Sequence, residues 1–343
     1  MADKSVSIWR SHFEQFWVSY QPFLLSRGYR LRPRYDPNWD HSWLEGKLFS
    51  LSEHSIPSVA PAALDAIRLS DNKKVVLKRI ETGDPEIGIA KYLDSLRQDP
   101  RNRTIPLLDS FALPDSEWTI IVMPYCRRFT FPPFHCPNEF VEAMSQFLEG
   151  LQFMHNHNIA HFDIAPQNML MDESEVVPRG SHFAFPDTHE GDLTFFYWRN
   201  RCSTGPTRYY YIDFGLSLHF PQGKQSALHT GTLRTFPTIP ELSLDVPYNP
   251  FYVDVYQLGL TMQRIIDEYY GLEAFVPVAA QMMADDPHAR PEPEKSLEQL
   301  HMIASKMSPA KLRGQIWEKN AGYWKKLSWW IWGGYPWELG RPC

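Results

Sequence analysis

The stretch AHFDIAPQN, residues 160–168, places a carboxylate and a carboxamide, Asp163 and Asn168, among apolar residues, with no lysine or arginine beside them. Polar groups in apolar surroundings usually need partners, so further polar residues are expected to meet this pair in the folded chain. A candidate occurs in YYYIDFGLS, residues 209–217, where Asp213 follows a strand-like run and precedes Gly215. The two stretches together predict one polar site.

The composition is that of a globular protein. The chain has 343 residues, 43% of them apolar and 22% charged, which leaves room for one large or two smaller domains. A net charge of −6 does not favour a nucleic-acid surface, and neither a transmembrane run nor a signal peptide is expected. The four cysteines are expected to be reduced thiols, neither disulfide-bonded nor bound to zinc, in a cytoplasmic or nuclear protein: Cys126, Cys136, Cys202 and Cys343.

The first half of the chain favours strands. ALDAIRL (63–69) and KVVLKRI (74–80) flank a polar turn, which predicts a hairpin, and WTIIVM (118–123) predicts a further strand. EIGIAKYLDSLR (86–97) predicts a helix with this apolar face: Ile87, Ile89, Tyr92, Leu93 and Leu96. Before these elements, GYRLRPRYDPNWDHSW (28–43) suggests an extended, packed segment rather than a helix.

The second half favours helices. Residues 138–157 predict a helix capped by Asn138, with these side chains on one stripe: Phe140, Met144, Phe147, Leu148, Leu151 and Met154. Residues 253–270 are apolar nearly all round, which is typical of a helix buried in a large core. A small strand-rich lobe therefore precedes a larger helical lobe, and a cleft is expected between them.

These motifs resemble those of protein kinases. HFDIAPQN resembles the catalytic loop H-R-D-L-x-x-x-N, DFG at 213–215 resembles the metal-binding motif, and VVLK ending at Lys78 resembles the V-A-I-K strand. Glu86 opens the next helix, where a kinase places the acidic partner of that lysine. The remaining matches are VMPYC (122–126) to the hinge, IPE (239–241) to A-P-E, DVYQLG from Asp254 to the central helix motif, and DPHARP with Arg290.

The resemblance covers residues 44–305 and implies an α+β fold with two lobes, a small antiparallel-sheet lobe with one helix and a larger, mainly helical lobe. The implied segments are an N-terminal extension at 1–43, the small lobe and hinge at 44–126, the large lobe at 127–306 with an insert at about 172–207, and a Trp-rich tail at 307–343.

The resemblance also implies ATP and magnesium as cofactors. Asn168 and Asp213 offer the oxygen ligands that suit magnesium, and Asp163 would accept a proton from the substrate hydroxyl. Lys78 would hold the α- and β-phosphates, with Glu86 fixing its side chain. The residues implied to be structural are His161, Phe214, Gly215, Glu241, Asp254 and Arg290.

Adenine is implied to bind at the hinge, behind the gatekeeper Met123. Adenine normally uses a carbonyl of the first hinge residue and an N–H of the third. Pro124 keeps its carbonyl although it lacks an N–H, and Cys126 keeps both groups, so the hinge sequence is compatible with adenine.

Four departures from the family pattern stand out. Counted back from Lys78, the three glycines of the phosphate-covering loop fall on Ile56, Ser58 and Pro61. Phe162 replaces the arginine that usually pairs with a phosphorylated loop. Ala165 stands where serine/threonine kinases usually have a lysine, and Gln167 replaces the arginine of tyrosine kinases, so neither specificity is indicated. The long insert before Asp213 and the upstream GYRLRPRYDPNW resemble a group of kinase-like proteins from fungi.

Simple structural interpretations exist for the single motifs. DFG alone is typical of a turn after a strand, and Lys78, Glu86, Glu241 and Arg290 alone are typical of exposed charges. His155 and His157 allow a metal-site hypothesis, although a helix-end turn is favoured. The tail at 323–343 suggests a membrane-interface anchor, although packing on the large lobe, or disorder in the free protein, is favoured.

Three functions agree with the sequence. The favoured one is a slow ATP-dependent protein kinase, of serine/threonine type, acting on a protein substrate. The second is a pseudokinase that serves as a nucleotide-binding or scaffolding module. The third is a small-molecule phosphotransferase of the aminoglycoside-kinase type, which the motifs IPE, DVYQLG and Arg290 disfavour. Five intact catalytic positions against one degraded loop favour the enzyme.

Overall fold

The computed structural model describes residues 10–39, 56–58, 60–191 and 196–322. It divides into unit 1, made of Met1–Gly88, Pro106–Tyr125 and Val177–Tyr197, and unit 2, made of Ile89–Ile105, Cys126–Val176 and Trp198–Cys343. Helices and antiparallel sheets both occur, so the expected α+β class is confirmed. Among the described residues, no helix is long and apolar enough to cross a membrane.

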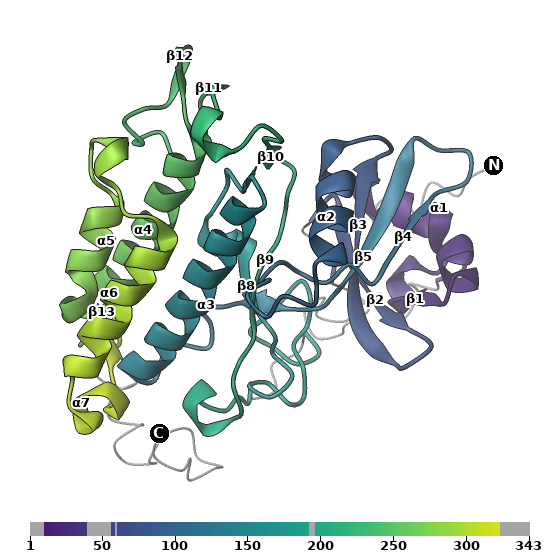
Figure 1. Cartoon of the computed structure of the whole chain (residues 1–343). Coiled ribbons are helices and arrows are strands. Elements are labelled where there is room, and N and C mark those ends of the chain that lie inside the picture. The colour runs from purple at the N-terminus through teal and green to yellow at the C-terminus, as the bar shows by residue number, and fades with distance from the viewer. Residues whose placement is uncertain (1–9, 40–55, 59, 192–195, 323–343) are drawn as a thin grey trace. The chain divides into compact units, whose positions relative to one another are not determined.

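Unit 1 contains a five-stranded antiparallel sheet (Figure 1). Its strands, in spatial order, are β1 (Tyr29–Leu31), β2 (Ala63–Arg68), β3 (Lys73–Glu81), β5 (Trp118–Pro124) and β4 (Asp109–Ala112). The predicted hairpin is confirmed, because β2 pairs with β3 and the turn between them holds Asn72 at φ 57°. The predicted strand at 118–123 is also confirmed.

One face of this sheet packs against a helix that the sequence did not reveal. Helix α1 (His12–Ser26) begins with a capping box, in which Ser11 and Glu14 bond each other's backbone N–H groups. Trp17 and Leu24 are buried against the sheet, whose contribution to this core is Leu64, Ala66, Val75, Leu77, Ile120 and Val122. The first residues of the chain that are described are therefore an integral layer of unit 1.

The N-terminal region also supplies the edge strand of the sheet. The segment expected to be extended forms β1 and a 3-10 turn, Pro33–Tyr35, and β1 pairs antiparallel with β2. Residues 32–62 therefore connect these two strands. The three expected glycine positions, Ile56, Ser58 and Pro61, lie in this connection, of which residues 40–55 and 59 are outside the described part of the chain.

Helix α2 (Pro85–Ser95) follows β3, as predicted. Asp84 accepts the Glu86 N–H at 2.8 Å, which satisfies one of the free donors at the start of the helix. Ile89 and Leu93 are buried, whereas Tyr92 is exposed, so the predicted apolar face is wrong at this tyrosine.

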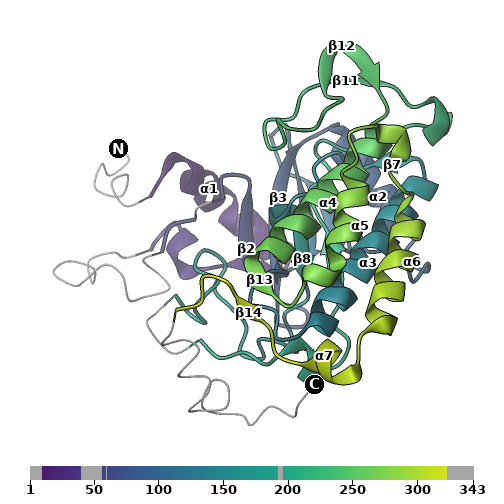
Figure 2. The ribbon, with the colours of Figure 1, turned by 90° about the vertical axis from the view of Figure 1, so that its left-hand side faces the viewer.

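Unit 2 is mainly helical. Its helices are α3 (Pro137–Asn156), α4 (Pro250–Glu268), α5 (Val276–Met282), α6 (Pro293–Lys306) and α7 (Pro309–Arg313). Figures 1 and 2 show α3 beside α6 and α4 beside α5. The predicted stripe of α3 is buried, but its cap is Cys136, followed by Pro137 at the first helical position, so Asn138 lies inside the first turn. The predicted helix at 253–270 ends at Glu268.

Short strand pairs complete unit 2. They are β6 (Arg127–Arg128), β8 (Met169–Met171) and β9 (Tyr209–Tyr211) in one sheet, and the pairs β7 (Ile159–Ala160) with β10 (Leu218–His219), β11 (His229–Gly231) with β12 (Ser243–Tyr248), and β13 (Tyr269–Tyr270) with β14 (Trp317–Glu318). The predicted insert leaves β8 and returns at β9, whose residues pair directly. The β11–β12 hairpin lies beyond one end of α4 (Figure 2).

The cysteine prediction is partly wrong. Cys126 and Cys136 are free thiols, as expected, but Cys202 is disulfide-bonded. The Trp-rich stretch at 323–343, and its suggested anchor or packing roles, lie outside the described residues.

Candidate active site

The catalytic-loop stretch in unit 2 is held by helix α4. The two carboxylate oxygens of Asp254 accept the backbone N–H groups of His161 at 2.8 Å and Phe162 at 2.7 Å. Gln257 accepts the N–H of Ile164 at 2.9 Å. Three backbone N–H groups of the loop are thus bonded to buried side chains of one helix, and Phe162 is held at φ 66°, an uncommon conformation for this residue type.

Asp163 and Asn168 form a bonded pair at this loop. The Asn168 amide nitrogen donates to the Asp163 carboxylate at 2.8 Å and to its backbone carbonyl at 3.0 Å. A 3-10 turn, Pro166–Asn168, brings the amide into place. The other carboxylate oxygen of Asp163 is buried and has no hydrogen-bond partner among the described residues. This oxygen therefore keeps its capacity to accept a hydrogen bond or a proton.

Burial raises the pKa of the Asp163 carboxyl above its ordinary value of 3.8. The neighbouring His161 and the Asn168 hydrogen bond act in the opposite direction, and the charge of Asp213 raises the pKa further. Asp163 therefore combines a free oxygen with greater basicity than a solvated aspartate, which suits a general base.

Asp213 follows β9 and is exposed, with φ 67°. The next residue, Phe214, is buried with its ring 5.5 Å from the His161 imidazole. One His161 ring nitrogen lies 3.1 Å from the Ile212 carbonyl, and Ser217 donates to the His161 carbonyl at 3.0 Å. The DFG stretch is therefore fixed on both sides of Asp213, while Asp213 itself is exposed.

These residues fit a magnesium ion. The Asn168 amide nitrogen is engaged with Asp163, so the amide oxygen is the remaining ligand atom, and Asp213 offers an exposed carboxylate. Hard oxygen atoms of this kind are the ligands that magnesium prefers in proteins.

Unit 1 holds the predicted lysine and its acidic partner. Lys78 on β3 and Glu86 on α2 form an ion pair with 2.5 Å between Nζ and Oε1. Glu86 is buried and Lys78 is partly buried, so the pair is only weakly screened by water. The ion pair fixes the lysine side chain beside the first turn of α2.

The predicted hinge consists of the last residues of β5 and the residues just after it. Met123 lies opposite Val76 and Pro124 lies opposite Val75 in the β3–β5 register. Cys126 begins the next segment of unit 2 and is buried, which raises the pKa of its thiol well above the ordinary value. This thiol is therefore not a reactive group.

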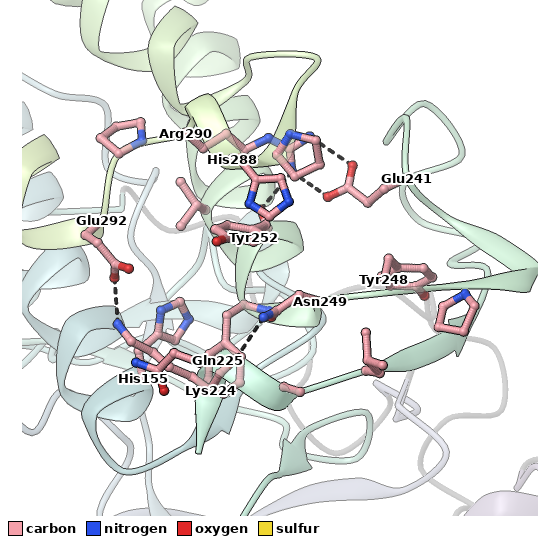
Figure 3. A pocket seen from close by; sticks show the side chains of 17 residues that line it. His155, Lys224, Gln225, Glu241, Tyr248, Asn249, Tyr252, His288, Arg290 and Glu292 are labelled. Atoms are coloured by element: carbon pink, nitrogen blue, oxygen red, sulfur yellow. Dashed lines mark hydrogen bonds and ion pairs between the residues drawn. The ribbon is translucent and has the colours of Figure 1, made fainter. Parts of the chain in front are cut away.

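A second ion pair in unit 2 joins Glu241 and Arg290, where the Nη2 to Oε2 distance is 2.9 Å. Figure 3 shows this pair at one wall of a cavity of about 470 Å³, with Lys224 and Glu292 paired at another wall. No residue of the catalytic loop or the DFG motif lines the cavity.

The histidines that allowed a metal hypothesis have other partners. His155 bonds the Asp254 carboxylate at 2.9 Å, and a ring nitrogen of His157 lies 3.2 Å from the Tyr92 hydroxyl. Among the described residues one group has metal-ligand spacing, Cys136 with Glu139 and Cys202, but the disulfide occupies the Cys202 sulfur. Neither group is a credible metal centre.

An aromatic cluster around Phe162 was not foreseen from the sequence. Its ring lies 5.0 Å from the His229 imidazole and 6.3 Å from the Tyr248 ring, which bind it to the β11–β12 hairpin. Apolar side chains complete this core: Leu233, Phe236, Ile239 and Val253. The replacement of arginine by phenylalanine was the only sequence signal for it.

Comparison with known proteins finds distant sequence matches. No family model matches the chain. A probable casein kinase II subunit alpha homolog of Encephalitozoon cuniculi is 21% identical over 199 residues, 57% of this chain and 52% of the relative. Serine/threonine-protein kinase stk11 of Xenopus laevis is 29% identical over 217 residues, 59% of this chain and 41% of the relative.

The chain is a distant relative of protein kinases. A putative sperm motility kinase W of Mus musculus is a further match, 28% identical over 138 residues, 40% of this chain and 21% of the relative. The chain spans about half, or less, of the length of these relatives. Two of the matched proteins are named as serine/threonine-protein kinases, those of Xenopus laevis and Gallus gallus.

Proposed function

We propose that the protein is an ATP- and magnesium-dependent kinase that phosphorylates serine or threonine hydroxyls of a protein substrate. The observation that carries this proposal is the Asp163–Asn168 pair, with its buried, unpartnered carboxylate oxygen held in place from α4. Phosphoryl transfer needs mainly positioning and neutralisation of charge, and a fixed loop of this kind supplies positioning.

Each motif residue has a role in the proposal. Asp163 orients the substrate hydroxyl and takes its proton, because its free oxygen and raised pKa suit a base. Asn168 and Asp213 would hold magnesium, which when bound neutralises charge on the phosphates of ATP. Lys78, held by Glu86, would bind the α- and β-phosphates.

The remaining roles concern adenine and control. Met123, Pro124 and Cys126 would form the adenine-binding hinge. Phe162 lies in an apolar cluster, so we propose that order in the β11–β12 region comes from packing and needs no phosphorylated side chain. The likeness to kinase-like proteins from fungi is part of the same proposal.

A pseudokinase is the second candidate, favoured by one observation. The connection between β1 and β2 runs from residue 32 to residue 62, and its described end at 56–58 contains no glycine and includes Pro57. Glycine lets backbone N–H groups approach phosphates closely, and proline removes one such donor. Slow turnover, below the ~1–100 s⁻¹ typical of kinases, is therefore expected even if the enzyme proposal is correct.

The test is phosphate transfer by the purified protein with labelled ATP and magnesium, to itself and to generic protein substrates. Slow transfer that disappears in Asp163→Asn is the expected result. ATP binding without transfer in any preparation would favour the pseudokinase, and the absence of both would refute both candidates.

A further inference from the structure

The sheet of unit 1 has two faces of different character. Side chains alternate along a strand, so Lys74, Val76 and Lys78 share one face of β3, whereas Val75 and Leu77 belong to the core beneath α1. The β3 face with Lys78 is the one that, under the proposed function, would receive the nucleotide.

The strand register locates, on this face, the residues that would contact the two ends of a nucleotide under the proposed function. Val76 lies between Asp65 on β2 and Met123 on β5. The proposed phosphate contact, Lys78, is two residues further along β3. The adenine end of the face is therefore the neighbourhood of Val76 and Met123, next to Lys74.

Part of the long insert lies against this end within unit 1. Lys74 donates to the Ser181 carbonyl at 2.8 Å, and the hydroxyl groups of Tyr125 and Ser181 are 2.8 Å apart. The Phe183 ring lies 6.3 Å from the Tyr125 ring. The insert is thus bonded to the β3 residue that precedes Val76 on the same face.

A second set of contacts reaches the other side of Val76. The Arg32 guanidinium donates to Asp65 at 3.1 Å and to the Ile56 carbonyl at 3.1 Å, and its Nη1 lies 3.3 Å from a ring nitrogen of His182. His182 is 1% exposed, and burial, followed by the charges of Arg32 and Lys74, lowers its pKa to about 3. The imidazole is therefore neutral beside these cations.

The insert also contacts the segment where the phosphate-covering glycines were expected. A Cβ placed on Gly191, which has φ +80°, would lie 2.1 Å from the Cδ1 atom of Ile56. Ile56 is buried, so the insert and this segment pack without space between them at that point. The contacts at Lys74, Arg32 and Ile56 come from three separate parts of unit 1.

We propose that residues 181–191 of the insert are a built-in plug that occupies the adenine end of the β3 face and competes with ATP. The proposal rests on the proposed function, because that function assigns the face to nucleotide. If the face is free in only a small fraction of the molecules, the apparent affinity for ATP equals the affinity of the free face multiplied by that fraction. Displacement of the plug is then a means of control that does not involve the Phe162 cluster.

The test weakens the plug without touching Lys78 or the hinge. His182→Arg places a cation beside Arg32 and Lys74 and should favour the undocked insert. Gly191→Ala acts at a separate point, through a strained φ and the Ile56 contact. The matched control is Gly205→Ala, also in the insert, where a Cβ would meet nothing within 4 Å and φ is not positive.

Calorimetry would measure dissociation constants of adenosine, ATP with magnesium, and tripolyphosphate, and hydrogen exchange would follow residues 181–191. Undocking should increase exchange there and strengthen adenosine and ATP binding by about 10-fold or more if the face is free in a tenth of the molecules or fewer. Tripolyphosphate binding and the control should stay unchanged, because the plug opposes only the base.

Three results would overturn the proposal. Equal ATP affinity in parent and variants, with exchange increased, would refute the plug and leave the proposed function standing. A gain for tripolyphosphate equal to that for adenosine would place the effect at the phosphate end. No binding of any nucleotide by a folded variant with increased exchange would refute the proposed function as well.

Discussion

The ring of Phe162 lies 5.0 Å from the imidazole of His229, an edge-to-face contact between the catalytic-loop stretch and β11. A kinase is expected to have an arginine at position 162, which would require a charged partner. The observed contact joins two aromatic rings, and the surrounding cluster is apolar and buried.

Phosphatase treatment is therefore expected to leave any transfer activity unchanged. Phe162 carries no charge, so it cannot form a charge-assisted hydrogen bond with a phosphate group on the chain. Phosphorylation therefore cannot order the site through position 162. The measurement is the initial rate of transfer before and after treatment, with the substrate added only after the phosphatase is removed. A clear fall in rate would contradict this prediction.

Phe162→Arg should destabilise unit 2, because a buried guanidinium would face apolar side chains without a partner. We expect a fall in the free energy of unfolding of about 3 kcal/mol or more, measured by urea denaturation. Phe162→Leu keeps the site apolar and serves as control, with a smaller loss expected. Equal stability of the two variants would show that the cluster tolerates charge.

ATP with magnesium should raise the melting temperature, and Asp213→Ala should remove most of the rise. Binding to the native state alone stabilises it, by ~2.7 kcal/mol at a ligand concentration 100 times the dissociation constant. Because the phosphate cover and the plug both predict weak binding, the scan requires millimolar ATP. An unchanged melting temperature in the parent would count against nucleotide binding.

Asp163→Asn should abolish transfer while nucleotide binding stays nearly intact. Loss of a general base typically costs about 10²- to 10⁴-fold in rate, and Asp163 occupies the base position rather than a metal position. Parallel rate and binding measurements separate the two effects. Equal rates in parent and variant would remove Asp163 from the mechanism.

The rate should fall on the acid side of the pH profile at a pH above 3.8. Burial raises the pKa of Asp163, and a base acts only when deprotonated, so activity present above that raised pKa is lost as the pH falls through it. The measurement is the rate from pH 4 to 8, with circular dichroism at each pH as control. A rate independent of pH over this range, in folded protein, would be inconsistent with this role.

Arg290→Ala should lower the free energy of unfolding by about 3–5 kcal/mol, because it leaves Glu241 without its guanidinium partner. Lys224→Ala is the matched control, because its pair with Glu292 is far more exposed and such pairs contribute about 0–1 kcal/mol. Denaturant titration of both variants gives the comparison. A similar loss of unfolding free energy in both variants would mean that the burial of an ion pair does not determine its contribution to stability here.

A glycine placed at position 56 would change packing within unit 1. Ile56 is buried beside Gly191, so Ile56→Gly removes packing at this contact. A cavity and a weakened insert contact are the expected consequences.

The sequence by itself determined the elements whose signal is local. The alternation in β2 and β3, the apolar stripes of α3 and α4, and the order of the motifs around Asp163, Asn168 and Asp213 are each contained in a few adjacent residues. Ion pairing of Lys78 with Glu86, and of Arg290 with Glu241, followed from the resemblance and occurs in the structure. Errors at Asn138 and Tyr92 lie at a helix end and at the edge of a helix face, where local signals are weakest.

Only the tertiary structure decided the rest. The edge strand at Tyr29–Leu31, the apolar surroundings of Phe162 and the contact of Ser181 with Lys74 all join residues far apart in the chain. Periodicity and propensity describe neighbours along the chain, whereas these contacts depend on which surfaces meet after folding. The long-range contacts of the insert are therefore what identify it as a candidate regulator of the nucleotide face.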